Sequence, residues 1–260
     1  MIDTHAHLDF EQFDRDRDFV ILRAQSTLRL VLNPTVNLES TKKALQVLKD
    51  YNFIYFCLGF HPHYADNFKE EVIEYYRDLI EANPRIVGIG EVGLDFYKSS
   101  SSAHTQIKVF EKFIKLAIDY HLPLVIHTRN AESKMIEVLK QYNLTSSLIF
   151  HCFSGSKELL EFTLTTNNFL SFAGNITYRN NTLLRDSLKE VGLPNLLLET
   201  DAPYLVPSSK RGQRNEPSFI FFTLNEVSNL LNIPSHQLEG ILEENTFRVF
   251  KIKQKENKRV

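Results

Sequence analysis

The chain contains 260 residues, of which 43% are hydrophobic and 24% are charged, and its formal net charge at pH 7 is −2. This composition is typical of a globular protein with a large core and argues against an intrinsically disordered chain. The slightly negative charge argues against a protein that coats nucleic acid nonspecifically, so we expect any nucleic-acid contact to be confined to an active site.

Eight short apolar runs, rich in β-branched residues, recur along the chain and predict β-strands. Most of them are apolar at consecutive positions, which is typical of parallel strands covered on both faces. The predicted strands span residues 2–7, 28–33, 53–61, 86–93, 124–127, 147–153, 169–173 and 195–201.

Longer amphipathic stretches separate these runs and predict helices. The clearest covers residues 103–121, where Phe110, Phe113 and Ala117 recur at three- and four-residue steps. The other predicted helices span residues 40–51, 69–83, 133–142, 157–165 and 182–191, and two more, at 217–231 and 235–250, follow the last strand.

Alternating strands and helices in a chain of this length predict an α/β fold, a single (β/α)8 TIM-type barrel with extra C-terminal helices. The barrel domain is expected to cover residues 1–250, followed by a charged C-terminal tail at residues 251–260. No linker rich in Gly, Ser or Pro divides the chain, so we expect one domain. A doubly wound open sheet is the alternative architecture for the same pattern.

The two cysteines, Cys57 and Cys152, lie in apolar runs and are predicted to be reduced core thiols rather than a disulfide. The N-terminal residues show no basic segment followed by an apolar one, so we expect no secretory signal peptide. No run of about 18 apolar residues occurs, so no membrane span is expected. These features together favour a cytoplasmic protein.

Ionisable residues interrupt the apolar runs where the predicted strands end. His5 and His7 are the sharpest example, because residues i and i+2 of a strand face the same way and both imidazoles can reach one ion. Such a pair alone is weak evidence, since two partly exposed polar residues at a strand end would look the same. The same kind of residue recurs at four other strand ends, at Glu91, His127, His151 and Asp201.

Buried carboxylates and clustered imidazoles are costly unless they are paired or bind a metal, and Glu91 and Asp201 lie in apolar contexts. Because barrel active sites lie at the C-terminal ends of the strands, we expect these groups to converge around cations. Mixed nitrogen and oxygen donors suit Zn²⁺, Mn²⁺ or Fe²⁺, whereas Mg²⁺ prefers oxygen and water.

Other common site signatures are absent from the sequence. It contains no C-x-x-C, which argues against a structural zinc site. It contains no Walker-type glycine loop and no G-x-G-x-x-G following a predicted strand, which argues against nucleotide binding. The lack of G-x-S-x-G argues against a serine hydrolase.

In their order along the chain, these motifs resemble the TatD family of metal-dependent deoxyribonucleases, within the wider amidohydrolase-like barrel group. The resemblance covers nearly the whole chain, and the block around Glu199, Thr200 and Asp201 is the strongest single one. Each block alone is modest evidence, but together and in register they are specific. The matching blocks are residues 2–9, 59–63, 90–97, 123–129, 151–155, 198–205, 211–217 and 245–250.

The resemblance implies two divalent cations per chain, Mg²⁺, Mn²⁺ or Zn²⁺. One would be bound by His5, His7, Glu91 and Asp201, and the second by Glu91, His127 and His151. One departure from the family pattern lies behind these ligands, at Asn130 and Ser133, where acidic residues are common. We expect altered tuning of the site there, not loss of activity.

The resemblance also implies a 3′–5′ exodeoxyribonuclease that hydrolyses phosphodiester bonds with a water activated by two cations, acting as a monomer on DNA, at single-stranded 3′ ends. Asp201 would accept the proton of that water as well as bind metal, and Glu91 is the second catalytic carboxylate. For Asp201, the alternative is a role as ligand only.

Four residues are predicted to contact the substrate, because they follow strand ends near the ligands: His63, Arg129, Arg211 and Arg214. For His63, a hydrogen bond that anchors its loop is the alternative. Glu199 is expected to orient a ligand histidine or Arg129, Asp95 is placed similarly, and Tyr97 is placed to stack on a base.

Two other functions stay open at this stage. The same metal site could serve a small-molecule amidohydrolase, lactonase or phosphotriesterase, or an aminoacyl-tRNA deacylase. Alternatively, the protein is no enzyme but a metal-loaded or DNA-binding protein, against which the six intact ligand positions argue.

Overall fold

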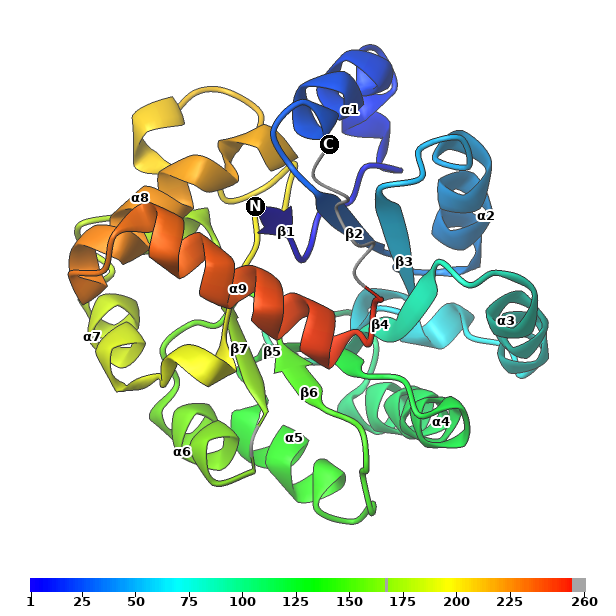
Figure 1. Ribbon diagram of the computed structural model, residues 1–260. Helices are drawn as coiled ribbons and strands as arrows, with labels where there is room; N and C mark the ends of the chain where they lie inside the picture. Colours follow the sequence, from blue (N-terminus) through cyan, green and yellow to red (C-terminus); the bar gives the residue numbers. More distant parts are fainter. Residues whose placement is uncertain (167, 254–260) are drawn as a thin grey trace.

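The computed structural model describes residues 1–166 and 168–253 and contains one parallel sheet of eight strands in the order β1 to β8 (Figure 1). Each strand pairs with the next along the chain, and helices alternate with the strands. This order confirms the predicted (β/α)8 barrel over the open doubly wound sheet. The strands are β1 Ile2–Asp3, β2 Leu30–Pro34, β3 Ile54–Leu58, β4 Ile86–Asp95, β5 Leu124–Arg129, β6 Leu148–Phe150, β7 Phe169–Phe172 and β8 Leu196–Leu198.

The barrel closes between β8 and β1 through backbone contacts beyond the ends of these two short strands. The His7 N–H donates to the Ala202 carbonyl at 2.8 Å, and the Asp201 N–H donates to the His5 carbonyl at 2.9 Å. Ala6 and Ala202 also form an isolated parallel bridge. Closure therefore places the residues that follow β1 next to those that follow β8.

Each of the eight predicted helices is found, and the described part of the chain contains one more, α1 Arg17–Gln25. The predicted eight are α2 Leu38–Val47, α3 Glu71–Ala82, α4 Ala103–Tyr120, α5 Glu132–Leu139, α6 Lys157–Thr166, α7 Thr182–Glu190, α8 Ile220–Leu231 and α9 Ser235–Val249. The sequence did not predict α1, because it buries Val20 and Ile21 but exposes Phe19 and Leu22, which leaves no clear amphipathic stripe. Among the described helices, none has the length and apolar character needed to cross a bilayer.

Side chains inside the barrel form a core at its N-terminal end, where α9 crosses (Figure 1). Val249, Phe250 and Ile252, from the end of α9 and just beyond it, pack against apolar residues of the strands. Those residues include Ile2, Leu30, Leu32, Cys57, Val87, Val125, Ile149, Phe169 and Leu197. Because this end is filled, a site is left to the C-terminal ends of the strands, where barrel enzymes carry it.

The predicted charged tail is described only as far as residue 253. Ile252 is buried in the inner core, and the Lys251 Nζ donates to the His121 carbonyl at 3.0 Å. The first residues of the stretch therefore pack on the barrel, and residues 254–260 lie outside the described part of the chain.

Glycines let the backbone of β4 approach its neighbours closely. Gly93 has a φ of +146°, and a Cβ there would lie 1.9 Å from the His127 carbonyl oxygen. A Cβ on Gly59, just after β3, would lie 2.2 Å from the Glu91 nitrogen. Residues 88–93 have the G-x-G-x-x-G spacing, but they lie inside β4 rather than in a loop. These glycines bring Glu91 next to β3 and β5 and do not form a nucleotide-binding turn.

We predict that Gly93→Ala lowers the free energy of unfolding by about 2 kcal/mol or more, because the new Cβ meets backbone and the φ value is strained for alanine. The matched control is Gly240→Ala in α9, where a Cβ meets nothing within 4 Å and alanine is expected to stabilise the helix by about 0.5–1 kcal/mol. Urea unfolding of both variants measures the difference. Equal midpoints would contradict the close packing of β4 on β5.

Candidate metal centre

At the C-terminal end of the barrel, the side chains that point into its interior are ionisable. Val125 in β5 belongs to the inner core, and His127 lies two residues further along the same strand. Ile149 and His151 repeat this relation at β6. Because alternate residues of a strand share a face, the inside of the barrel changes from an apolar layer to an ionisable one toward this end.

Glu91, in β4, lies at the centre of the ionisable layer. Its side chain is only 4% exposed. Its carboxylate contacts five imidazoles: Oε1 lies 2.8 Å from His151 Nε2, 2.9 Å from His127 Nδ1 and 3.4 Å from His61 Nε2, and Oε2 lies 3.4 Å from Nε2 of both His5 and His7. One buried carboxylate therefore joins histidines from β5 and from the chain after β1, β3 and β6.

Asp201 lies on the β8 side of the centre. Its Oδ1 lies 3.8 Å from His5 Nε2 and 3.7 Å from His7 Nε2, and these two nitrogens lie 3.1 Å apart. The three side chains come from the two segments that the barrel closure brings together. Their ligand atoms are close enough to share one cation.

A second group of ligand atoms comprises His61, Glu91 and His127. His151 adjoins this group through its contact with Glu91. All six predicted metal ligands are thus brought together at one end of the barrel. His61 was not predicted as a ligand, although its place at the end of the predicted strand 53–61 carried the same signal as the other histidines.

The donor set fits divalent cations. Imidazole nitrogens and carboxylate oxygens, the atoms that bind such cations, face one another within a few ångströms, and the Nε2 atoms of His5 and His7 lie 3.1 Å apart. Taking such groups out of water is costly unless a cation or a partner compensates them. Imidazole and carboxylate together suit Zn²⁺, Mn²⁺ or Fe²⁺.

The contacts of Glu91 dominate the electrostatics of the centre. Burial alone would raise the pKa of Glu91, but the imidazoles of His151, His61 and His127 outweigh it and hold this pKa well below its usual range. Burial alone would lower the pKa of His151, but Glu91 and Glu199 outweigh it and hold that pKa well above its usual range. Protons and a cation would therefore compete for these nitrogen and oxygen atoms.

Asp201 differs from Glu91 in both exposure and charge. Burial raises the pKa of Asp201 to about 7, although His151 and His7 act in the opposite direction. Its side chain is 13% exposed, compared with 4% for Glu91. Asp201 is therefore the more accessible of the two carboxylates and the more easily protonated.

Asp95, at the end of β4, orients two histidines. Its Oδ2 accepts from His127 Nε2 at 3.2 Å and from His63 Nε2 at 2.8 Å. A carboxylate on the outer nitrogen of a ligand imidazole fixes the ring and its tautomer. His127 thus presents Nδ1 to Glu91. The same carboxylate of Asp95 anchors the His63 imidazole. This contact is of the hydrogen-bonding kind that was the alternative to a substrate contact for His63.

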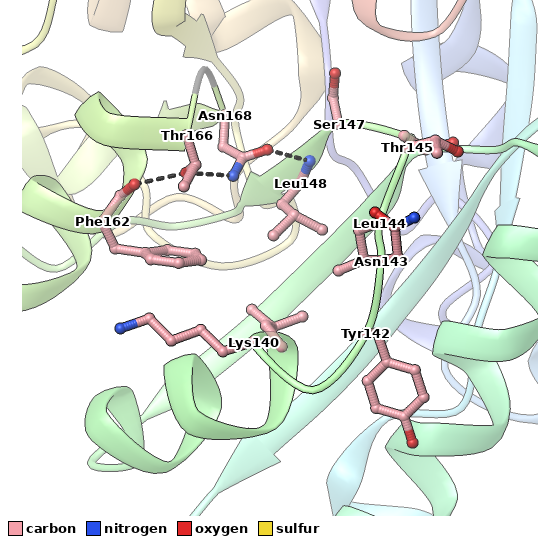
Figure 2. A pocket seen from close by; sticks show the side chains of 12 residues that line it. Lys140, Tyr142, Asn143, Leu144, Thr145, Ser147, Leu148, Phe162, Thr166 and Asn168 are labelled. Atoms are coloured by element: carbon pink, nitrogen blue, oxygen red, sulfur yellow. Dashed lines mark hydrogen bonds between the residues drawn. The ribbon is translucent and has the colours of Figure 1, made fainter.

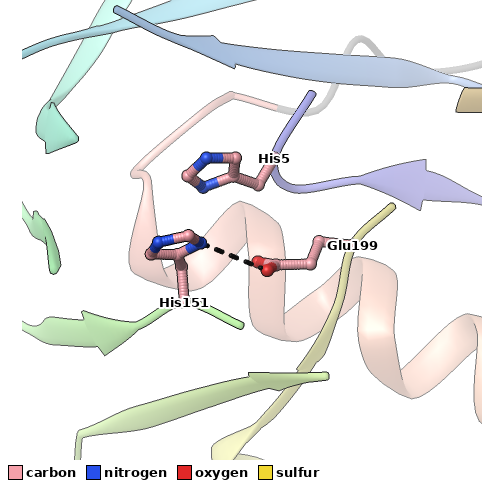
Figure 3. A group of neighbouring side chains, drawn as sticks. All are labelled: His5, His151 and Glu199. Carbon is pink, nitrogen blue, oxygen red and sulfur yellow. Dashed lines mark ion pairs between the residues drawn. The ribbon is translucent and has the colours of Figure 1, made fainter. Parts of the chain in front are cut away.

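Glu199 plays a similar part beneath His151. Its Oε1 accepts from the Cys152 backbone N–H at 2.7 Å and lies 3.4 Å from His151 Nδ1 (Figure 3). The rings of His5 and His151 are stacked, with centroids 4.1 Å apart and planes at 15°. Their in-plane lone pairs therefore run side by side instead of toward one point. Although His5, His151 and Glu199 are close enough to share an ion, this geometry suits orientation of the imidazoles.

Asp3 ties together the two segments that close the barrel. Its Oδ1 accepts from the Thr200 N–H at 2.9 Å and its Oδ2 from the Thr200 hydroxyl at 2.6 Å. The His5 N–H also donates to Asp3. Burial raises the pKa of Asp3 to about 8. This buried carboxyl therefore fixes the backbone on both sides of the His5–Asp201 contact.

The predicted substrate-binding arginines differ in their freedom to bind a substrate. Arg129 and Arg211 are exposed, and the Arg129 guanidinium lies 4.2 Å from the centroid of the Tyr97 ring. Arg214 instead forms two hydrogen bonds with Asp16, at 2.8 and 2.7 Å. Because its terminal nitrogens are already engaged, we assign Arg214 a structural role instead of a contact with the substrate.

A surface hollow lies at the opposite end of the barrel, in loops that precede strands (Figure 2). Asn168 lines this hollow, and its side-chain Oδ1 accepts a hydrogen bond from the Leu148 N–H at 2.8 Å. None of the groups of metal-ligating side chains found in the described residues lies there. The N-terminal face of a barrel usually serves stability. The hollow is lined by Leu139, Lys140, Tyr142, Asn143, Leu144, Thr145, Ser146, Ser147, Leu148, Phe162, Thr166 and Asn168.

The sequence from β1 to the end of the barrel matches one known family. The model of TatD related DNase covers residues 2–251. The chain belongs to this family. The resemblance recognised in the sequence motifs is thereby confirmed over nearly the whole length.

Relatives of this TatD-family chain are named as metal-dependent hydrolases. YabD of Bacillus subtilis is 35% identical over 259 residues, which cover 97% of this chain and 99% of YabD. YjjV of Escherichia coli K12 is 29% identical, and its crystal structure matches with a TM-score of 0.90 over 97% of this chain and 98% of YjjV. A TatD-family hydrolase from Entamoeba histolytica shares the fold, at 23% identity and a TM-score of 0.87. This protein is a metal-dependent hydrolase of the TatD family.

We predict that Mn²⁺ raises the Tm of this TatD-family hydrolase and that the gain grows from pH about 5.5 to pH about 8. The pKa values of His7, His127 and His151 are raised and that of Asp201 is about 7, so protons compete with the cation at low pH. At pH 8 and a concentration about 100-fold above Kd, binding adds about 2.7 kcal/mol, or about 5–10 °C.

Differential scanning calorimetry of metal-free and Mn²⁺-loaded protein measures this shift. Glu91→Gln is the control variant and is expected to lose most of it, because it removes the charge shared by both ligand groups. A shift of equal size at both pH values would contradict competition between protons and the cation.

Proposed function

We propose that this hydrolase cleaves phosphodiester bonds and releases nucleotides from the 3′ end of DNA, with single-stranded ends preferred. The observation that carries the proposal is the position of Glu91, whose two oxygens face two groups of ligand atoms at once. A carboxylate shared between two cation sites is suited to in-line displacement at phosphorus. The description of the matching family supports DNA as the substrate.

We assign two divalent cations, Mg²⁺, Mn²⁺ or Zn²⁺, to the centre. When bound, they would supply Lewis acidity at a phosphate oxygen and lower the pKa of the attacking water. The contacts of Glu91 with both groups support its assignment as the shared ligand. His5, His7, Glu91 and Asp201 would hold the first cation, and Glu91, His127 and His151 the second.

Asp201 is the residue that we assign to proton transfer. It is more exposed than Glu91, at 13% compared with 4%, so it is the carboxylate that an attacking water reaches more readily. Glu91 is enclosed by imidazoles and has its pKa held low, so it serves as a ligand and as the negative charge that keeps the histidines in place. These two carboxylates thus divide the catalytic roles.

Arg129 and Arg211 are the cationic side chains that we assign to the substrate phosphates. Both are exposed on the side of the barrel that carries the centre, Arg129 as the last residue of β5 and Arg211 in the segment after β8. A planar guanidinium donates two parallel hydrogen bonds to phosphate oxygens. His63 is held by Asp95 and acts with it by positioning His127. The whole centre is built from one chain, which supports action as a monomer, and we place that action in the cytoplasm.

We predict that Asp201→Asn lowers kcat about 100- to 10,000-fold, because the amide cannot accept the proton of the attacking water. The assay follows a 3′-end-labelled single-stranded oligonucleotide with saturating Mn²⁺, beside amide and lactone substrates that are expected to react more slowly. Asp186→Asn, an exposed carboxylate in α7, is the matched control and keeps the wild-type rate. Wild-type cleavage by nuclease-free Asp201→Asn would remove the role assigned to Asp201.

We predict that Arg129→Ala raises KM for the oligonucleotide about 10-fold, through loss of a charge-assisted contact with phosphate. The dependence of binding on salt should flatten by about one unit of logarithmic slope. Arg214→Ala is the matched comparison, and it should lower Tm without raising KM, because Arg214 is engaged with Asp16. A larger KM effect at Arg214 than at Arg129 would reverse these assignments.

A further inference from the structure

Exposed aromatic side chains gather at the end of the barrel that carries the metal centre. Of the exposed large hydrophobic side chains in the described part of the chain, half are aromatic residues in segments that follow β3, β4 and β8: Tyr64, Phe96, Tyr97 and Tyr204. Exposing large aromatic rings to water is unfavourable, so a cluster of them beside a polar site calls for a partner. Three of them also have interactions that tie them to the centre, and we call Tyr64, Tyr97 and Tyr204 the aromatic rim.

Tyr97 is fixed beside the centre but leaves its ring in solvent. Its backbone N–H donates to Asp95 Oδ1 at 2.9 Å, and the same carboxylate holds His127. The Arg129 guanidinium covers the ring at 4.2 Å, yet the side chain is 61% exposed. A side chain that can donate hydrogen bonds to phosphate, Arg129, therefore lies next to an exposed aromatic ring, that of Tyr97.

Tyr204 borders the other side of the centre. Its N–H donates to the Asp201 carbonyl at 2.9 Å, and its ring meets Phe10, which stacks on His7 with centroids 4.4 Å apart. The side chain is 48% exposed. In the closed strand order, three strands separate β4 from β8 in either direction. Tyr97 and Tyr204 therefore lie on opposite sides of the mouth of the barrel.

Tyr64 completes the rim between these two positions. Its backbone N–H donates to the carbonyl of His61 at 2.9 Å, and the imidazole of His61 in turn contacts Glu91. Tyr64 is 38% exposed. The rim therefore borders the centre in the segments that follow β3, β4 and β8.

We propose that the aromatic rim stacks on unpaired bases next to the scissile phosphate and thereby selects the unpaired end of a nucleic-acid strand. This inference rests on the proposed phosphodiester cleavage and adds the residues that recognise the substrate. Stacking suits this chain, because its net charge of −2 provides little nonspecific attraction for a polyanion. In a duplex the faces of the bases are covered by their neighbours, so an aromatic side chain reaches them only at an unpaired end.

The test compares two single-stranded oligonucleotides of one sequence, the second with abasic residues at its 3′-terminal positions. Tyr97→Ala and Tyr204→Ala are each expected to raise KM about 10-fold on the intact strand, with little change in kcat. On the abasic strand the same variants are expected to match the wild type, because no base is left to stack. Tyr97→Phe keeps the ring and is expected to recover most of the loss.

Phe19→Ala in α1 is the matched control, because it removes an exposed ring outside the rim. Tm values of all variants identify any loss of fold. If the alanine variants lose the same factor on intact and abasic strands, the rim does not stack on bases and the inference is overturned, while phosphodiester cleavage stands. If the wild-type protein cleaves neither strand with Mn²⁺, the proposed function fails and the inference fails with it.

Discussion

The arrangement of the centre depends on one constraint, the burial of the Glu91 carboxylate inside the barrel. A buried negative charge is tolerated only with compensating partners, and five imidazoles from four parts of the chain supply them. Two of those imidazoles are held from outside, His127 by Asp95 and His151 by Glu199. The close approach of β4 to its neighbours, which glycine permits, sets the position of Glu91. The centre is therefore one connected network, in which no ligand is positioned independently of the others.

The closure of the barrel connects this network to the whole chain. His5 and Asp201 are separated by most of the sequence, yet backbone hydrogen bonds and the buried Asp3–Thr200 contact hold them side by side. A fragment that lacked β1 or β8 would lose one side of the first ligand group. Assembly of the centre and closure of the barrel are thus a single event, and a bound cation stabilises both.

Much of the fold and of the centre was predictable because both follow local patterns. Apolar runs mark parallel strands, and Glu91 or Asp201 in such a run signals a site. Ser133 lies in the first turn of α5, and Asn130 precedes that helix by two residues. What escaped the sequence depends on contacts between distant residues. Arg214 lies in a basic segment and was expected to be free to bind the substrate, but its actual partner, Asp16, lies far away in the chain. Helix α1, which lacks a clear apolar stripe, forms under tertiary contacts that its own sequence does not reveal.

The metal centre and the loops around it carry different parts of the function. Imidazoles and carboxylates around two cations can attack carbonyl and phosphoryl groups alike, so the centre alone does not select a substrate. Selection has to come from side chains that the cations do not engage. We assign this selection to Arg129, which offers a planar hydrogen-bond donor, and to Tyr97, whose ring lies against the Arg129 guanidinium and is largely exposed to water. Both residues adjoin Asp95, which orients His127. A base stacked on Tyr97 would therefore have a fixed position relative to the metal ligands.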